Sequence, residues 1–187
     1  MQLHVYLLQC LTLLALLAAG ADLEAYQIVS QWASERGVQL QENQQYALYE
    51  YWYHAPNIQQ CSPSGSFVHA RLIVGQVIWK NRRRDRDFVG STYDLWKDGG
   101  ILNNAFGGTT SSKKEEWKPG QFKTRSRGWQ HVNADITYEY AGEVAHDVDA
   151  NMIKRLGDAY CQQHPKYSII NNNCITFVET VYANIHQ

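Results

Sequence analysis

Residues 167–178, with the sequence YSIINNNCITFV, indicate a polar turn that leads into a helix. Asparagine is a preferred helix cap, so we expect the helix to begin at or beside Cys174. A thiol at that place lies next to unpaired backbone N–H groups and the positive end of the helix dipole, and both favour the nucleophilic thiolate. The stretch therefore predicts a reactive cysteine at the start of a helix.

The residues that follow keep helical spacing. One face of this helix carries the side chains of Cys174, Val178, Val181, Tyr182 and Ile185. Residues spaced in this way share one side of a helix, so Cys174 is expected to point toward the element on which the helix packs. The sheet that carries His69 is the natural candidate.

Strand patterns precede this helix. In the stretch from Phe67 to Trp79 residues alternate between two faces, with Val68, Ala70, Leu72 and Val74 on one and Phe67, His69, Arg71 and Ile73 on the other. Such alternation is typical of a strand, and it places His69 on a face of mixed polarity. A charged turn over residues 81–87 and a returning strand from Phe88 to Trp96 are expected next, and His131–Tyr140 alternates most cleanly of all.

Helical patterns lie on both sides of these strands. Asp22–Glu35 and Val148–His164 have apolar residues at helical spacing, and either Asp147 or Asp149 can cap the second helix. The aromatic run Tyr46–Tyr53 fits a helix or a strand, and core packing is the preferred interpretation over a substrate platform. Residues 99–128 are rich in Gly, Ser, Thr, Asn and Lys, so a long, poorly ordered loop is expected there. This order predicts an α+β fold with an antiparallel sheet packed with helices.

The first residues predict export. Leu7–Ala19 is an apolar run, and Ala19-Gly20-Ala21 has the form of a signal-peptidase site. We therefore expect a signal peptide over residues 1–21 and a secreted single domain over residues 22–187. Met1–Tyr6 contains no Lys or Arg, which leaves an uncleaved anchor as the alternative. No second apolar stretch approaches the ~20 residues of a membrane span, so no stable span is expected.

The net charge and the absence of known binding motifs argue against several classes of function. The formal net charge is -1, which provides no overall field for nucleic acid, so no nucleic-acid partner is expected. The sequence contains no recognisable zinc spacing, glycine-rich phosphate loop or Gly-x-Ser-x-Gly elbow. We therefore predict no cofactor and no metal.

The number of cysteines indicates whether Cys174 has a free thiol. Removal of the leader takes Cys10 away and leaves three cysteines, Cys61, Cys161 and Cys174. An odd count in an oxidising compartment leaves one thiol over. We predict a Cys61–Cys161 disulfide with Cys174 free, and the alternative is that Cys174 is a buried thiol or one half of a disulfide.

Two motifs resemble a known superfamily. His69-Ala-Arg-Leu-Ile-Val-Gly75 resembles the first-strand motif of the lecithin retinol acyltransferase-like proteins, and Asn173-Cys174-Ile-Thr-Phe177 resembles the start of their later helix. Residues 167–177 also resemble the corresponding segment of the PPPDE peptidases. Both groups belong to the permuted NlpC-type branch of the papain-like superfamily, in which the histidine precedes the cysteine.

The resemblance implies a permuted papain-like fold in which Cys174 is the nucleophile and His69 the general base. It leaves the third catalytic group open among Asn81, Asn133 and Asp135, and some relatives use a dyad. The expected function is a secreted cysteine hydrolase or acyl-transfer enzyme that acts on an amide, isopeptide or ester bond through a thioester. The alternative is a non-catalytic secreted binding or effector-like module on the same scaffold.

Overall fold

The computed structural model describes residues 25–54, 69–80, 85–98, 106–124 and 128–186. In chain order the elements are α2 (Ala25–Glu35), β1 (Gln45–Tyr53), β2 (His69–Lys80), β3 (Asp85–Asp98), β4 (Phe106–Glu116), β5 (Gln121–Thr124), β6 (Gly128–His131), β7 (Asp135–Glu143), α3 (Ala150–Gln163), β8 (Lys166–Ser168) and α4 (Cys174–Ala183). The predicted α+β class with an antiparallel sheet and packed helices is confirmed.

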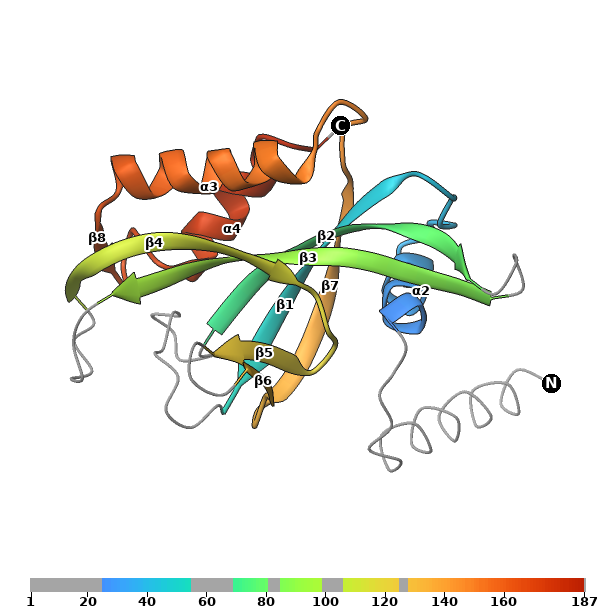
Figure 1. Ribbon diagram of the computed structural model, residues 1–187, viewed down its shortest axis with the longest axis horizontal. Coiled ribbons are helices and arrows are strands. Elements are labelled where there is room, and N and C mark those ends of the chain that lie inside the picture. Colours follow the sequence, from blue (N-terminus) through green and yellow to red (C-terminus); the bar gives the residue numbers. More distant parts are fainter. Residues whose placement is uncertain (1–24, 55–68, 81–84, 99–105, 125–127, 187) are drawn as a thin grey trace.

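One six-stranded sheet organises the molecule. Its strand order is β7-β1-β2-β3-β4-β8, and every neighbouring pair is antiparallel. Helices α3 and α4 lie against one face, while α2 and the two-stranded β5–β6 hairpin lie on the other (Figure 1). The sheet is therefore covered on both faces along its central strands.

The aromatic run that fitted either a helix or a strand is β1. This strand lies between β2 and β7, and both Ala47 and Leu48 are fully buried on opposite faces. Aromatic side chains are favoured on such a pleated surface because they pack against neighbours on the adjacent strands. Trp52 is 3% exposed, which agrees with the preferred interpretation of this run as core.

Strands β2 and β3 form the hairpin that the sequence predicted. Their register pairs Gly75 with Gly90 and Ile73 with Thr92. The connecting residues 81–84 are outside the described residues. The hairpin gives the sheet its two longest neighbouring strands, and each of them contributes to both hydrophobic clusters.

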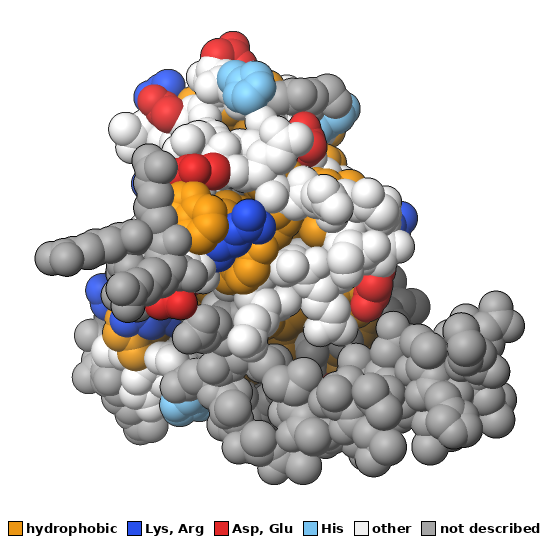
Figure 2. Space-filling model, turned by 90° about the vertical axis from the view of Figure 1, so that its right-hand side faces the viewer, with side chains coloured by type: hydrophobic (Ala, Val, Ile, Leu, Met, Phe, Trp, Pro, Cys, Tyr) orange, Lys and Arg blue, Asp and Glu red, His pale blue; other side chains and the backbone are white. Residues whose placement is uncertain are grey.

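The two faces of the sheet have separate cores. Under α3 and α4 the buried residues are mainly small and aliphatic, and they include Ala70, Leu72, Val74, Leu95, Cys174, Phe177, Val178 and Val181. Under α2 aromatic rings make up a larger share of the buried residues, which are Tyr46, Phe88, Trp117 and Tyr140 together with Ile28, Val29, Ala33, Leu48, Ile73 and Val77. On the molecular surface seen in Figure 2, hydrophobic side chains form several patches interrupted by charged and polar groups.

The predicted loop over residues 99–128 is wrong in its central part. Half of this stretch forms β4 and β5, and β4 pairs with both β3 and β8. The middle of β4 lacks the apolar alternation that marks a half-buried strand, because it consists of Thr109, Thr110, Ser111 and Ser112. Threonine nevertheless favours strands, and the hydrogen bonds to β3 hold this polar segment in the sheet.

The predicted strand His131–Tyr140 is divided in two. Strand β6 ends at His131, and β7 begins at Asp135. The alternation within β7 is confirmed, because Ile136, Tyr138 and Tyr140 are more buried than their neighbours. The two strands belong to different sheets, because β6 pairs with β5 and β7 pairs with β1 in the six-stranded sheet.

Both C-terminal helices were predicted within a few residues. Asp149 caps α3, with its carboxylate accepting a hydrogen bond from the backbone N–H of Met152 at 2.6 Å. The α2 helix ends near Gly37, whose positive φ of 73° suits glycine. Residues 1–24, which contain the predicted signal peptide, lie outside the described residues. Within the described part of the chain, no helix has the length and apolar character needed to cross a membrane.

Candidate functional site

Helix α4 begins where the sequence predicts. Asn173 is the N-cap, and its side-chain Oδ1 accepts hydrogen bonds from the backbone N–H groups of Ile175 at 2.9 Å and Thr176 at 3.2 Å. The Thr176 hydroxyl in turn accepts from the Asn173 backbone N–H at 2.9 Å. This reciprocal capping box satisfies donors that the first turn leaves unpaired. It fixes Cys174 as the first residue of α4, and its side chain is fully buried.

The oxidation states of the cysteines differ from the prediction. Cys174 is disulfide-bonded, whereas Cys161 carries a free, buried thiol. The predicted pairing of Cys61 with Cys161 is therefore wrong, and so is the prediction of a free Cys174. Cys61 itself lies outside the described residues. Because a half-cystine has no thiol, Cys174 cannot attack a carbonyl in this oxidised form.

Burial explains why Cys161 is a poor nucleophile. It lies on the inner face of α3 and is 8% exposed. Burial raises the pKa of the Cys161 thiol above its usual value, and a hydrogen bond with Thr110 opposes this rise. A buried thiol with a raised pKa stays protonated at neutral pH and reacts slowly.

His69 and Cys174 lie on opposite faces of the sheet. Cys174 packs in the hydrophobic cluster under α3 and α4, and this cluster also contains Ala70. His69 precedes Ala70 in β2, and successive side chains of a strand point to opposite faces. His69 instead contacts Trp52, with 4.9 Å between the two ring centroids. The expected Cys174–His69 pair is not assembled.

The packing of α4 explains this outcome. The helix covers the face that presents Ala70, Leu72 and Val74. Burial of a continuous apolar face gains more free energy than burial of a face that carries an imidazole and a guanidinium. The strand alternation was predicted correctly, but the face on which the helix packs was not.

The partner of His69 is Asp94 of β3, a residue that no sequence motif indicated. His69 Nε2 lies 2.9 Å from Asp94 Oδ1, and the two side chains are only 11% and 8% exposed. The other carboxylate oxygen of Asp94 accepts a hydrogen bond from the Trp96 indole N–H at 3.0 Å. The β2–β3 hairpin was the available signal, because its antiparallel register brings the last residues of the returning strand beside His69.

Of the three residues that the resemblance leaves open as the group orienting His69, two lie in the described part of the chain, and both are exposed. Asn81 lies outside the described residues. Asn133 is exposed in the connection between β6 and β7. Asp135 is also exposed, and its carboxylate lies 3.3 Å from His54 Nδ1.

A second buried ionic group adjoins His69 on the same face. The Glu50 carboxylate is fully buried and accepts hydrogen bonds from Arg71 Nε at 3.0 Å and from the indole N–H of Trp117 at 3.1 Å. The indole N–H of Trp52 also donates to Glu50. The Arg71 guanidinium lies 4.5 Å from the centroid of the Trp52 ring. Each charge therefore has a partner, as buried charges require.

The β5–β6 hairpin covers this network. Arg71 Nη2 donates to the backbone carbonyl of Gln121 in β5 at 3.2 Å. The ring of Phe122, also in β5, lies 5.8 Å from the Trp52 ring. These contacts hold the hairpin against the sheet on the side of His69 and Arg71.

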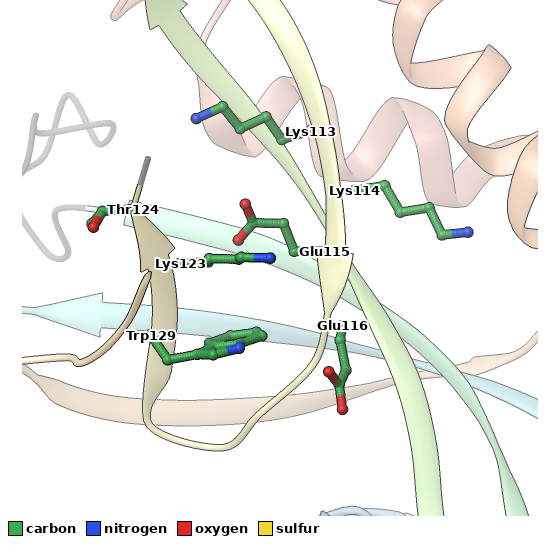
Figure 3. Close-up of a pocket in the computed structure, with 7 residues that line it drawn as sticks. All are labelled: Lys113, Lys114, Glu115, Glu116, Lys123, Thr124 and Trp129. Atoms are coloured by element: carbon green, nitrogen blue, oxygen red, sulfur yellow. The ribbon is translucent and has the colours of Figure 1, made fainter. Parts of the chain in front are cut away.

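A polar pocket opens between this hairpin and β4. Its volume is about 430 Å³, and its lining residues are Lys113, Lys114, Glu115, Glu116, Lys123, Thr124 and Trp129. Figure 3 shows Lys123 and Trp129 extending from the hairpin toward β4, with Glu115 extending from β4 toward Lys123 and Lys114 pointing to the opposite side. A pocket with this lining suits recognition of a polar ligand, because it combines an aromatic ring with charges of both signs.

Among the described residues there is no group of three or more His, Cys, Asp or Glu side chains placed to hold a metal ion. Comparison with known proteins found no matching family model, no matching curated protein and no matching solved structure.

Proposed function

We propose that the protein is an exported binding module that works without catalysis by Cys174. The observation that carries this proposal is the disulfide at Cys174. The sulfur that would form a thioester is already bonded to another sulfur, so the nucleophile of the expected reaction is absent.

The position of His69 supports the same conclusion. A general base must come within hydrogen-bond reach of the group that it deprotonates. His69 is engaged by Asp94 and Trp52 on the face opposite Cys174. Reduction of the disulfide would therefore release a thiol that does not have His69 beside it.

The proposed scaffold is a permuted papain-like fold in a secreted protein. Its support is the resemblance of the two sequence motifs, the antiparallel sheet and the helix that begins at Cys174. Disulfides persist in oxidising compartments, so the state of Cys174 supports an extracellular location. In this proposal a disulfide-bonded cysteine occupies the position at which other members of the superfamily carry the catalytic nucleophile.

The second candidate is a cysteine hydrolase or acyl-transfer enzyme that is active when reduced. It is favoured by the place of Cys174 immediately after the Asn173 cap. The backbone N–H groups of the first turn would stabilise a thiolate and a developing oxyanion there.

Peptide mapping under non-reducing conditions tests the disulfide. Elimination of Cys161, which is free, and of Cys10, which lies in the expected leader, predicts a peptide linked through Cys61 and Cys174. Iodoacetamide should label Cys161 after denaturation, and it should label Cys174 only after reduction. A native protein in which Cys174 is alkylated without reductant would contradict the proposal.

Labelling of the reduced protein separates the two candidates. We expect Cys174 to react no faster than an unperturbed thiol after mild reduction, and the His69→Ala variant to react at the same rate. The matched control is His164→Ala, which changes an exposed histidine in the loop after α3. Fast labelling that His69→Ala abolishes, together with hydrolysis of an amide or ester substrate, would establish the enzyme in place of the binding module.

A further inference from the structure

Lysine ammonium groups in and beside the pocket are held over tryptophan rings. Lys118 Nζ lies 4.5 Å and Lys123 Nζ 6.0 Å from the centroid of Trp129, and Lys113 Nζ lies 3.1 Å from the centroid of Trp96. Cation–π attraction restricts the long lysine side chains. The positive charges are therefore placed before a ligand arrives, which lowers the entropy cost of binding.

The same pocket contains carboxylates. Glu115 and Glu116 line it together with Lys113, Lys114 and Lys123. Glu116 Oε2 also lies 3.9 Å from Lys118 Nζ. The charges nearly balance, so a ligand with negative charge along its whole surface would be repelled at the glutamates as well as attracted at the lysines.

The balanced lining favours a ligand with one anionic group and several hydroxyl groups. The anionic group would bind the ammonium of Lys123, while hydroxyl groups would donate hydrogen bonds to the Glu115 carboxylate. The Thr124 hydroxyl donates to the backbone carbonyl of Gly128 at 3.4 Å, and its oxygen can accept a hydrogen bond from the ligand. Trp129 contributes an apolar ring edge against which C–H groups of the ligand can pack.

The volume of the pocket limits the size of the ligand. A pocket of about 430 Å³ is at the small end of the usual range for small-molecule sites, roughly 300–1,000 Å³. It accommodates one or two sugar rings. The pocket lies between β4 and the β5–β6 hairpin (Figure 3).

We propose that this pocket binds an acidic sugar unit, a carboxylate-bearing ring of an extracellular polysaccharide. This inference rests on the proposed function as an exported binding module and names its class of ligand. Lys123 binds the carboxylate, Glu115 and the Thr124 oxygen accept hydrogen bonds from hydroxyl groups, and Trp129 packs against the ring.

Isothermal titration of the oxidised protein with defined oligosaccharides tests the proposal. The probes are tetragalacturonate and a hyaluronan tetrasaccharide, and the matched neutral ligand is fully methyl-esterified tetragalacturonate. We expect at least one acidic probe to bind, more weakly at higher salt because salt screens the charge on the carboxylate. Esterification should weaken binding of tetragalacturonate if that is the probe that binds.

Variants locate the binding site. Lys123→Gln should weaken binding about fivefold and Trp129→Ala about tenfold, as expected for loss of a charge contact or an aromatic contact of about 1 kcal/mol. Lys166→Gln is the matched control because Lys166 is also exposed but lies in β8, and it should change affinity less than twofold. Urea unfolding of each variant confirms that the fold is retained.

Several outcomes would overturn the inference. They are no binding of either acidic probe at 1 mM, equal binding of the esterified ligand, equal weakening by Lys166→Gln, and tighter binding of single-stranded oligothymidylate than of both sugars. These outcomes leave the state of Cys174 untouched, so the inference can fail while the binding-module proposal stands. Conversely, Cys174-dependent hydrolysis with normal sugar binding would reject the proposed function alone.

Discussion

At the scale of single residues, the pairing of Glu50 with Arg71 has the largest energetic consequence. Glu50 is fully buried and Arg71 is 3% exposed, so neither charge is solvated by bulk water. Arg71 and the indoles of Trp52 and Trp117 all donate to the Glu50 carboxylate. Removal of the carboxylate would leave a buried guanidinium without its counter-charge.

We therefore expect Glu50→Ala to lower the free energy of unfolding by about 3–5 kcal/mol. Urea unfolding followed by tryptophan fluorescence measures this change. The control is Glu139→Ala, because Glu139 forms an exposed ion pair with Arg36 at 3.2 Å. Its loss should be about 0–1 kcal/mol.

A double substitution distinguishes the ion pair from simple packing. Glu50→Leu combined with Arg71→Leu should destabilise the protein less than Glu50→Ala alone, because no buried charge is left unpaired. Equal destabilisation by Glu50→Ala and Glu139→Ala would show that the buried network contributes little.

Features of the site could be predicted from the sequence where they depend on interactions between residues close in the chain. The capping asparagine before Cys174 could be recognised from sequence because a cap interacts within one turn of its own helix. The partner of His69 could not be recognised in the same way, because Asp94 is distant in sequence. The disulfide at Cys174 could not be predicted either, because an odd number of cysteines does not determine which two of them are bonded.

At the scale of elements, the β2–β3 hairpin depends on a pair of glycines. A Cβ on Gly75 would clash with the backbone carbonyl of Val89 and would lie 2.5 Å from Gly90 Cα. A Cβ on Gly90 would meet its nearest neighbours at 3.0 Å. The two strands approach closely where these glycines pair in register.

Substitution by alanine should therefore have graded effects. Gly75→Ala should lower the free energy of unfolding by about 1–3 kcal/mol, as expected for overpacking against rigid backbone. Gly90→Ala should cost less, because the nearest atoms to its Cβ lie at 3.0 Å, whereas all three of the nearest atoms to a Cβ on Gly75 lie closer than this. Thermal and urea denaturation of both variants measure the order, and a larger loss for Gly90→Ala would contradict the steric explanation.

Strand β4 shows where element prediction from sequence fails. Its residues are polar, and of the described side chains in its first half Thr110 is buried while Thr109 is exposed. Hydrophobic periodicity is the main signal for a strand, and this segment has almost none. Pairing with β3 and β8 supplies the stabilisation that the local sequence does not provide.

At the scale of the whole molecule, buried tyrosines link stability to alkaline pH. Burial raises the pKa of Tyr167 from 10.0 to about 12. It also raises the pKa of other phenols on both faces of the sheet, among them Tyr49, Tyr51, Tyr93 and Tyr140. The folded state therefore binds these protons more tightly than the unfolded chain does.

The sign of the pH effect follows from these shifts. For Tyr167 the contribution to stability is fully present below its ordinary pKa of about 10 and is lost as pH rises through about 12. We expect the free energy of unfolding to fall as pH rises from 9 to 12 in urea titrations. Tyr167→Phe should show a smaller fall over the same range, and an unchanged pH dependence would exclude a contribution from this phenol.

The sequence by itself determined the local features of this protein: the alternation of β2, the caps of α3 and α4, and the α+β class. These features depend on interactions between residues close in the chain. Only the tertiary structure decided which face of β2 receives α4, that His69 pairs with Asp94, and that β4 is a strand. These outcomes depend on total apolar burial and on long-range pairing of strands, and a one-residue alternation is enough to place His69 and Cys174 on opposite sides of the sheet.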